Sequence, residues 1–300
     1  MMKLRKYLRD HSFLLLLMPY LVFFVLFIII PIIAAIVLSF TQFDSIQAPV
    51  FVGIDNYVRI FTQDAVFMQK VLPNTLIFSI IVGPGGYILS VLMAWLLAQL
   101  TKVPRTICTI IAYSPSLTSG VIMSTVWQVL FSGDQAGYLN SLLIQWGIIM
   151  QPITFLQNES LLMPIMIGVS LWSSMGIGFL AILAGFVNMD QELLEAAKLD
   201  GVSNRFQELI YVIIPYTKPT MLFGAVMAMV NTFAGSGIGV SLSGTNPTPG
   251  YAGQLIVNHI EDVGYLRYEI GYAGAVSVVL LLFIWWCSKV CYKLFGSSDE

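Results

Sequence analysis

The segment DQELLEAAKLDGVSNRFQE, residues 190–208, is the most highly charged part of an otherwise apolar chain. Seven of its nineteen residues are ionisable, whereas the whole chain is 57% hydrophobic and 10% charged. Asp190 is placed to cap a helix, the following residues are strong helix formers, and Gly201 can supply a left-handed turn. Ser203 can then cap a second helix. The segment predicts a short helix, a sharp glycine turn and a helix that continues into the next apolar run.

The rest of the chain has the composition of an all-α membrane protein. The mean hydropathy of its 300 residues is +0.84, and roughly 20 apolar residues are enough to cross the ~30 Å hydrocarbon core of a bilayer. Long apolar runs with almost no charge predict six transmembrane helices, at about 13–40, 71–100, 107–131, 161–187, 209–235 and 271–295. They form one six-helix transmembrane domain over 13–295, between a lead of residues 1–12 and a tail of 296–300.

The basic residues predict how this domain is oriented. With six spans and an inner N-terminus, 11 of the 14 basic residues fall in cytoplasmic segments, and only Arg59, Lys70 and Arg267 lie outside. Cytoplasmic loops are enriched in Lys and Arg, so both termini are expected in the cytoplasm. The outer segment 41–70 interleaves aromatic and acidic residues, which suits either a short amphipathic piece at a surface or an ordinary loop.

Two absences narrow the class of function. No ionisable residue falls in the central part of any predicted span, whereas carriers driven by ion gradients usually need such groups or broken-helix carbonyl sites. The chain also has no Gly-Lys dipeptide and therefore no phosphate-binding GxxxxGK[ST] loop. If ATP drives this protein, another subunit must bind it. Cys287 and Cys291 lack partner ligands, so no metal site is expected.

Neutral polar residues inside the spans form two candidate solute faces. Ser170, Ser173 and Ser174 are spaced as one face of a helix, and Asn231, Thr232, Gly235 and Ser236 form a second. Such groups suit an uncharged polyhydroxylated solute, although small polar residues also serve tight helix packing. The sequence Gly-Pro-Gly-Gly at 83–86 further predicts a break or kink within the second span.

Around residues 195–215 the chain resembles the permease subunits of binding-protein-dependent ABC importers, in particular the maltose-type carbohydrate family. The resemblance rests on an EAA loop formed by Glu195, Ala196, Ala197, Asp200, Gly201 and Pro215, with a spacing one residue longer than the common form. It extends across the six-span core, including Asn74-Thr75 in the second span and Gly137 and Asn140 after the third. The large extracytoplasmic insertion of the maltose permease itself is missing.

The resemblance implies a type I ABC importer permease fold and a multi-pass protein of the bacterial cytoplasmic membrane. Its partners would be a second homologous permease, two ATP-binding cassette subunits and an extracytoplasmic solute-binding protein, with a carbohydrate as substrate and no nucleic acid. The EAA loop would dock into an ATPase subunit, which would bind ATP and Mg, so this chain needs no cofactor and has no catalytic residue. Solute contacts would come from the spans that flank the loop.

The sequence alone leaves two other classes of function open. An ion-coupled or passive carrier would act alone, and transport by the purified chain in liposomes without an ATPase would identify it. An intramembrane serine hydrolase is suggested by Gly235-Ser236-Gly237 and His259. No second span supplies a base near Ser236, which argues against that interpretation.

Overall fold

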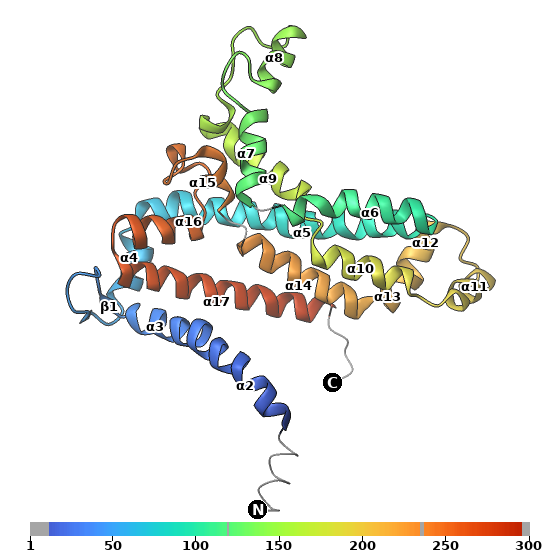
Figure 1. Cartoon of the computed structure of the whole chain (residues 1–300), viewed down its shortest axis with the longest axis horizontal. Coiled ribbons are helices and arrows are strands. Elements are labelled where there is room, and N and C mark those ends of the chain that lie inside the picture. The colour runs from blue at the N-terminus through green and yellow to red at the C-terminus, as the bar shows by residue number, and fades with distance from the viewer. Residues whose placement is uncertain (1–11, 119, 235–236, 296–300) are drawn as a thin grey trace, which may run out of the picture. The chain divides into compact units, whose positions relative to one another are not determined.

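The computed structural model describes residues 12–118, 120–234 and 237–295, and they are mostly helical (Figure 1). Among these residues, four helices are long and apolar enough to cross a membrane. The number rises to six if each of two sharply bent helix pairs counts as one span. The chain divides into two compact units, one running up to Gln63 together with Val263–Val279, the other comprising Asp64–Asp262 and the residues from Leu280 on.

The first unit begins with a long apolar helix, which is followed by two short strands and a short helix. Its elements are α2 (Ser12–Phe24), the π-helical turn η1 (Val25–Ile29), α3 (Ile30–Leu38), the antiparallel strands β1 (Thr41–Gln42) and β2 (Val50–Phe51), and α4 (Asp55–Thr62). The amide of Asn56 on α4 donates to the carbonyls of Ser39 and Thr41, both at 2.9 Å. The expected amphipathic piece is therefore present as α4, and Ile60 is its buried residue.

Asp44 shapes the loop between the two strands. Its carboxylate accepts hydrogen bonds from the backbone N–H groups of Gln47, at 2.9 Å, and Ile46, at 3.0 Å. These bonds lower the pKa of the Asp44 carboxyl, because they favour its charged form. They also stabilise a turn in which Ser45 has a φ of 66°.

The second unit contains most of the helices. In chain order they are η2 (Phe67–Val71), α5 (Leu72–Ala98), α6 (Lys102–Leu117), α7 (Gly120–Leu130), α8 (Tyr138–Gln145), η3 (Phe155–Gln157), α9 (Glu159–Trp172), α10 (Ile177–Val187), α11 (Gln191–Leu199), α12 (Arg205–Glu208), η4 (Leu209–Ile213), α13 (Ile214–Tyr216), α14 (Lys218–Ala234), α15 (Ile238–Ser243), η5 (Pro249–Tyr251) and α16 (Ile256–Glu261). The turn η6 (Asp262–Leu266) and α17 (Ile270–Phe295) each contribute residues to both units.

The core of the second unit is the packing of α5, α10 and α14 against one another (Figure 1). Phe179 and Ile182 of α10 are essentially fully buried in a cluster that also takes residues from α5, η4 and α14. Small residues allow the close contact: a Cβ atom added at Gly178 would lie 3.1 Å from the carbonyl oxygen of Gly224. Glycine at this crossing lets the two backbones approach directly, as is common between membrane helices.

The predicted break at residues 83–86 is wrong. Helix α5 runs without interruption from Leu72 to Ala98, with Pro84 in its interior. The glycines serve close packing instead, because an added Cβ would lie 3.2 Å from the Leu171 side chain at Gly85 and 2.8 Å from the Ser174 side chain at Gly86. The glycines therefore let other helices approach α5.

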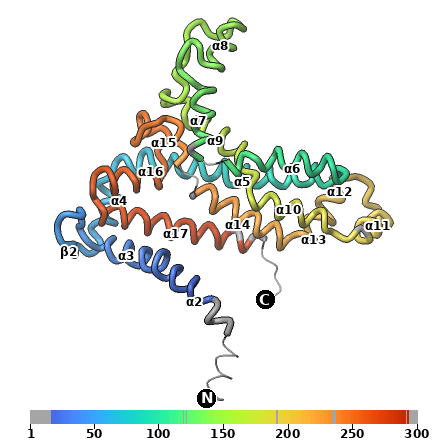
Figure 2. The backbone as a smooth tube through the Cα atoms, viewed as in Figure 1, coloured from blue at the N-terminus to red at the C-terminus, as the bar shows by residue number. Residues whose placement is uncertain are grey.

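The helix after the glycine turn runs into the fifth predicted span (209–235) as far as Tyr216, as expected, but the span itself then bends. Arg205–Tyr216 and Lys218–Phe233 meet at an angle of 86° (Figure 2). The bend falls at Thr217, two residues before Pro219, which has no backbone N–H to donate and whose ring would clash with the Pro215 carbonyl in a continuous helix. The predicted cap is also displaced by one residue: the side chain of Asn204, not Ser203, accepts from the backbone of Gln207 at 2.8 Å.

A bend of 96° likewise divides the third predicted span, between Lys102–Leu117 and Ile122–Leu130. Pro115 precedes the bend, and Thr118 has extended backbone angles. The six-span count and the cytoplasmic placement of both termini stay predictions.

Placing a β-branched side chain at the α10–α14 crossing tests this packing. We expect Gly178→Val to destabilise the protein in detergent by about 1–3 kcal/mol, because the backbone of Gly224 cannot move aside as a flexible side chain could. Thermal unfolding followed by fluorescence measures the effect. Gly168→Val on α9 is the matched control, since nothing lies within 4 Å of a Cβ at that exposed site. Equal melting temperatures for the two variants would contradict the account of the crossing.

Candidate functional site

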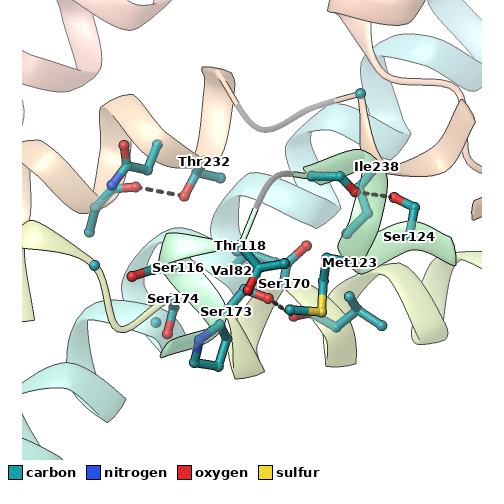
Figure 3. Close-up of a pocket in the computed structure, with 18 of the residues that line it drawn as sticks. Val82, Ser116, Thr118, Met123, Ser124, Ser170, Ser173, Ser174, Thr232 and Ile238 are labelled. Carbon is teal, nitrogen blue, oxygen red and sulfur yellow. Dashed lines mark hydrogen bonds between the residues drawn. The ribbon is translucent and has the colours of Figure 1, made fainter. Parts of the chain in front are cut away.

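A cavity of about 550 Å³ lies where the bent and broken helices of the second unit meet (Figure 3). Helices α5, α6, α7, α9, α10, α14 and α15 all contribute to its wall. Hydroxyl groups gather on one part of the wall, with those of Ser116, Ser173 and Ser174 close together and Thr232 on α14 across from them (Figure 3). A cavity of this size and mixed lining is typical of a small-molecule site.

The three serines of the fourth predicted span reach this cavity by a different route from the one expected. They do not share one helical face, because α9 ends at Trp172 and α10 begins at Ile177. Ser173 is the C-cap of α9, and Gly176 has an extended backbone. Ser170, Ser173 and Ser174 nevertheless all line the cavity, since the break turns the chain along its wall.

Three hydroxyl groups of the wall donate their hydrogens to the backbone. Ser173 donates to the Val169 carbonyl at 3.0 Å, Ser174 to Leu171 at 2.7 Å, and Thr232 to Ala228 at 2.8 Å. A hydroxyl oxygen that donates in this way still has lone pairs that can accept. The wall therefore presents mainly acceptors, which suit the hydroxyl donors of a solute.

The residues predicted on the fifth span lie partly at the same cavity. Asn231 and Thr232 both line it, and the amide nitrogen of Asn231 lies 3.7 Å from where a Cβ of Gly176 would be. Gly235 and Ser236 fall outside the described residues. The adjoining Gly237 lines the cavity.

Several lining residues were not predicted from the sequence. These are Tyr113, Ser116 and Thr118 near the bend of the third predicted span, Ser124 on α7 and Ser241 on α15. The polar residues around Pro115, which interrupt an otherwise apolar segment, were the sequence feature that could have identified the lining residues near this bend. Among the described lining residues, none is a Lys, Arg, His, Asp or Glu.

Two glutamine side chains hold α15 at the cavity. The amide of Gln128 on α7 donates to the carbonyl of Ser241, and that of Gln157 in η3 donates to the carbonyl of Ser243, both at 2.7 Å. The last carbonyls of a helix have no partners within it. The two amides therefore fix the end of a short helix that contributes Ile238 and Ser241 to the wall.

Asn74, Thr75 and Asn140 organise the loops of the second unit. The amide of Asn74 donates to the Tyr251 carbonyl at 2.8 Å, and the Thr75 hydroxyl accepts from the Ile256 backbone at 3.0 Å. Asn140 is fully buried and exchanges two hydrogen bonds with the backbone of Ile153. These side chains replace the backbone partners that irregular segments lack.

The charged loop 190–208 lies at the end of α10 opposite the cavity (Figure 2). As predicted, the carboxylate of Asp190 caps α11 by accepting from the backbone of Glu192 at 3.0 Å. Gly201 ends the helix with a φ of 96°, also as predicted. Glu195, Ala196, Asp200 and Gly201 are exposed, and Ala197 is half-buried.

His259 lies within hydrogen-bonding distance of a carboxylate. It is buried on α16, and its Nε2 lies 3.2 Å from a carboxylate oxygen of Asp64. Its ring also packs against Phe67, with centroids 5.7 Å apart. This environment orients the imidazole between helices and gives no support to a serine hydrolase. Within the described ranges, no group of three His, Cys, Asp or Glu residues could hold a metal ion.

Comparison with known proteins gives one consistent result. Residues 86–287 match the family described as "Binding-protein-dependent transport system inner membrane component". The chain is 29% identical over 283 residues to the arabinooligosaccharides transport system permease protein AraP of Bacillus subtilis, covering 93% of this chain and 87% of AraP.

Two solved structures have the same fold. The crystal structure of a bacterial ABC transporter involved in the import of the acidic polysaccharide alginate superposes with a TM-score of 0.81 at 22% identity, over 99% of this chain and 100% of that one. A bacterial alginate ABC transporter in complex with an alginate pentasaccharide-bound periplasmic protein superposes with a TM-score of 0.79 at 22% identity, over 97% and 98%.

The fold and the family match define a membrane transport subunit rather than an enzyme. The chain belongs to the family of binding-protein-dependent transport system inner membrane components, the permease subunits of ABC transporters. The resemblance drawn from the EAA loop is thereby confirmed.

Labelling with a polar thiol reagent tests whether the cavity holds water. In a background without the native cysteines, we expect Ser173→Cys to react at least about tenfold faster with a charged maleimide than Leu92→Cys. A thiol must ionise in water to react, and Leu92 is a partly exposed apolar residue of α5 outside the cavity lining. Equal rates at the two positions would rule out a hydrated cavity.

Proposed function

We propose that this chain is the permease subunit of an ATP-driven importer of uncharged sugars or oligosaccharides, and that its cavity forms half of the translocation pathway. The observation that carries the proposal is the position of α10, which begins at the cavity wall with Ile177 and ends three residues before Asp190. At 1.5 Å per residue, its 11 residues span about 16 Å. One short, buried helix thus links the solute site to the exposed loop.

The chemistry of the wall supports a neutral, hydroxyl-rich solute. Serine and threonine oxygens accept, the Asn231 amide can donate, and the described lining offers no charge to an acidic sugar. Alginate, which the structural relatives import or bind, is acidic. An arabinooligosaccharide, as in the name of AraP, is the kind of solute that this lining suits.

The membrane arrangement follows from the same proposal. If each bent helix pair counts as one span and the N-terminus is inside, the proposal puts loop 190–208 and both termini in the bacterial cytoplasm, and the enrichment of basic residues in those segments supports it. The cavity is then framed by irregular backbone within the membrane. Such backbone is tolerated where it lines a water-filled space.

The free energy of ATP binding and hydrolysis would be transmitted to this chain through loop 190–208. We infer that Glu195, Ala196, Ala197, Asp200 and Gly201 dock on an ATP-binding cassette subunit, which binds ATP and Mg in place of this chain. Closure of two such subunits would move the loop and, through α10, the cavity wall. A second, homologous permease would complete the pathway. An extracytoplasmic solute-binding protein would deliver the sugar, as the periplasmic protein bound to the alginate transporter suggests.

Straining the glycine turn tests the coupling role. We expect Gly201→Val, in the assembled importer, to lose most sugar uptake while inserting normally, because a β-branched residue at a φ of 96° costs about 1–3 kcal/mol and distorts the turn. Uptake of labelled sugar and ATP hydrolysis are measured in the same proteoliposomes.

Gly147→Val is the matched control, since Gly147 also has a positive φ, 70°, and open space around it, but lies after α8. Full ATP-dependent uptake by Gly201→Val would remove the loop from the mechanism. Equal loss in both variants would assign the effect to general destabilisation.

A further inference from the structure

Glu208 is the buried acidic residue at the base of loop 190–208. Only 6% of its surface is exposed. One carboxylate oxygen lies 3.3 Å from the Arg205 guanidinium, and the other lies 3.9 Å from the Lys198 ammonium. A buried carboxylate needs such partners, because an unpaired charge is costly to remove from water.

This pairing determines the charge that the loop presents to its surroundings. Residues 190–208 contain five carboxylates and two cations, and both cations lie at Glu208. The other four acids, Asp190, Glu192, Glu195 and Asp200, are exposed. The Lys198 and Arg205 side chains are themselves 57% and 67% exposed, so the loop presents four exposed acids against two cations and is acidic on balance.

A large apolar side chain stands within this acidic surface. Leu199, the last residue of α11, is 90% exposed, whereas Leu194 on the same helix packs against the core of α5, α10 and α14. Leu194 thus packs α11 against the core, whereas Leu199 remains exposed to solvent. A lipid surface is a poor partner for this face, because the cytoplasmic leaflet is itself negatively charged.

We propose that Leu199 is the anchor of the docking surface, entering an apolar pocket of the ATP-binding cassette subunit whose rim is basic and faces the exposed acids. Glu208 acts as a positioning residue that draws the charged ends of Lys198 and Arg205 toward the base of the loop and offsets part of their charge. The inference rests on the proposed coupling role of the loop and adds the residue and the partner chemistry by which docking occurs. A few side chains that enter well-packed, desolvated pockets carry most of the affinity of a protein interface, and the contacts around them mainly exclude water.

The test measures reassembly of the complete importer. The permease pair in nanodiscs is titrated with its ATPase subunit at about 50 mM and about 300 mM salt, conditions that change the screening of exposed charges. We expect Leu199→Ser to weaken binding at least about tenfold at both salt concentrations. Leu199→Met should stay within about twofold, since it keeps the apolar volume.

Two further variants separate charge from apolar contact. Glu208→Gln frees two cations beside the acidic rim, so binding at low salt should fall about threefold and its salt dependence should weaken. Met150→Ser is the control for lost apolar surface, because Met150 is 97% exposed and far along the chain from the loop. Its ATPase affinity should be unchanged.

Unaltered affinity of Leu199→Ser would overturn the anchor assignment. If Gly201→Val still abolished uptake, the coupling role of the loop would stand and only the anchor would fall. If neither variant had an effect, both proposals would fail. Equal weakening by Leu199→Ser and Met150→Ser would also contradict the assignment, since a specific pocket cannot respond to both.

Discussion

The direct contact between α10 and its neighbours α5 and α14 is the constraint on which the second unit depends. Gly178 lets the backbone of α14 approach, and Gly86 lets the start of α10 lie against α5 beside Ser174. Phe179 and Ile182 then fill the space between the three helices. Because packed interiors transmit displacement rather than absorb it, a helix held in this way can relate movement at one end to movement at the other.

The cavity and the loop are the two consequences of this packing. The cavity exists because α9 stops at Trp172 and the chain resumes as α10, and because the helix pair Lys102–Leu117 and Ile122–Leu130 bends by 96° beside it. Each interruption replaces helical backbone with hydroxyl-bearing or glycine residues. At the other end, Leu194 seats α11 on the same core, and Gly201 turns the chain back toward α14. The packing of α10 against α5 and α14 therefore supports both the polar wall of the cavity and the acidic loop.

The local chemistry of the chain was readable from the sequence, whereas its bends were not. Asp190 and Gly201 act as their residue types predict, because capping and positive φ are local properties. The role of the Gly-Pro-Gly-Gly segment depends on which residues pack against it. Its contacts with Leu171 and Ser174 are distant in sequence and cannot be recognised from the segment itself. Ser173 and Ser174 line the cavity but do not share one helical face, because apolar content does not reveal where a span breaks. The burial of Glu208 depends on tertiary packing, which the spacing of charged residues in the segment does not reveal.

The central claim is that loop 190–208 touches the subunit that hydrolyses ATP. A photo-crosslinking amino acid in place of Ala196, which is small and exposed on α11, tests it in the assembled importer. The account predicts a covalent adduct with the ATPase subunit whose yield changes when ATP binds, and no such adduct from the same group in place of Met150. Crosslinking of position 196 to lipid or to the second permease alone, with or without ATP, would contradict it.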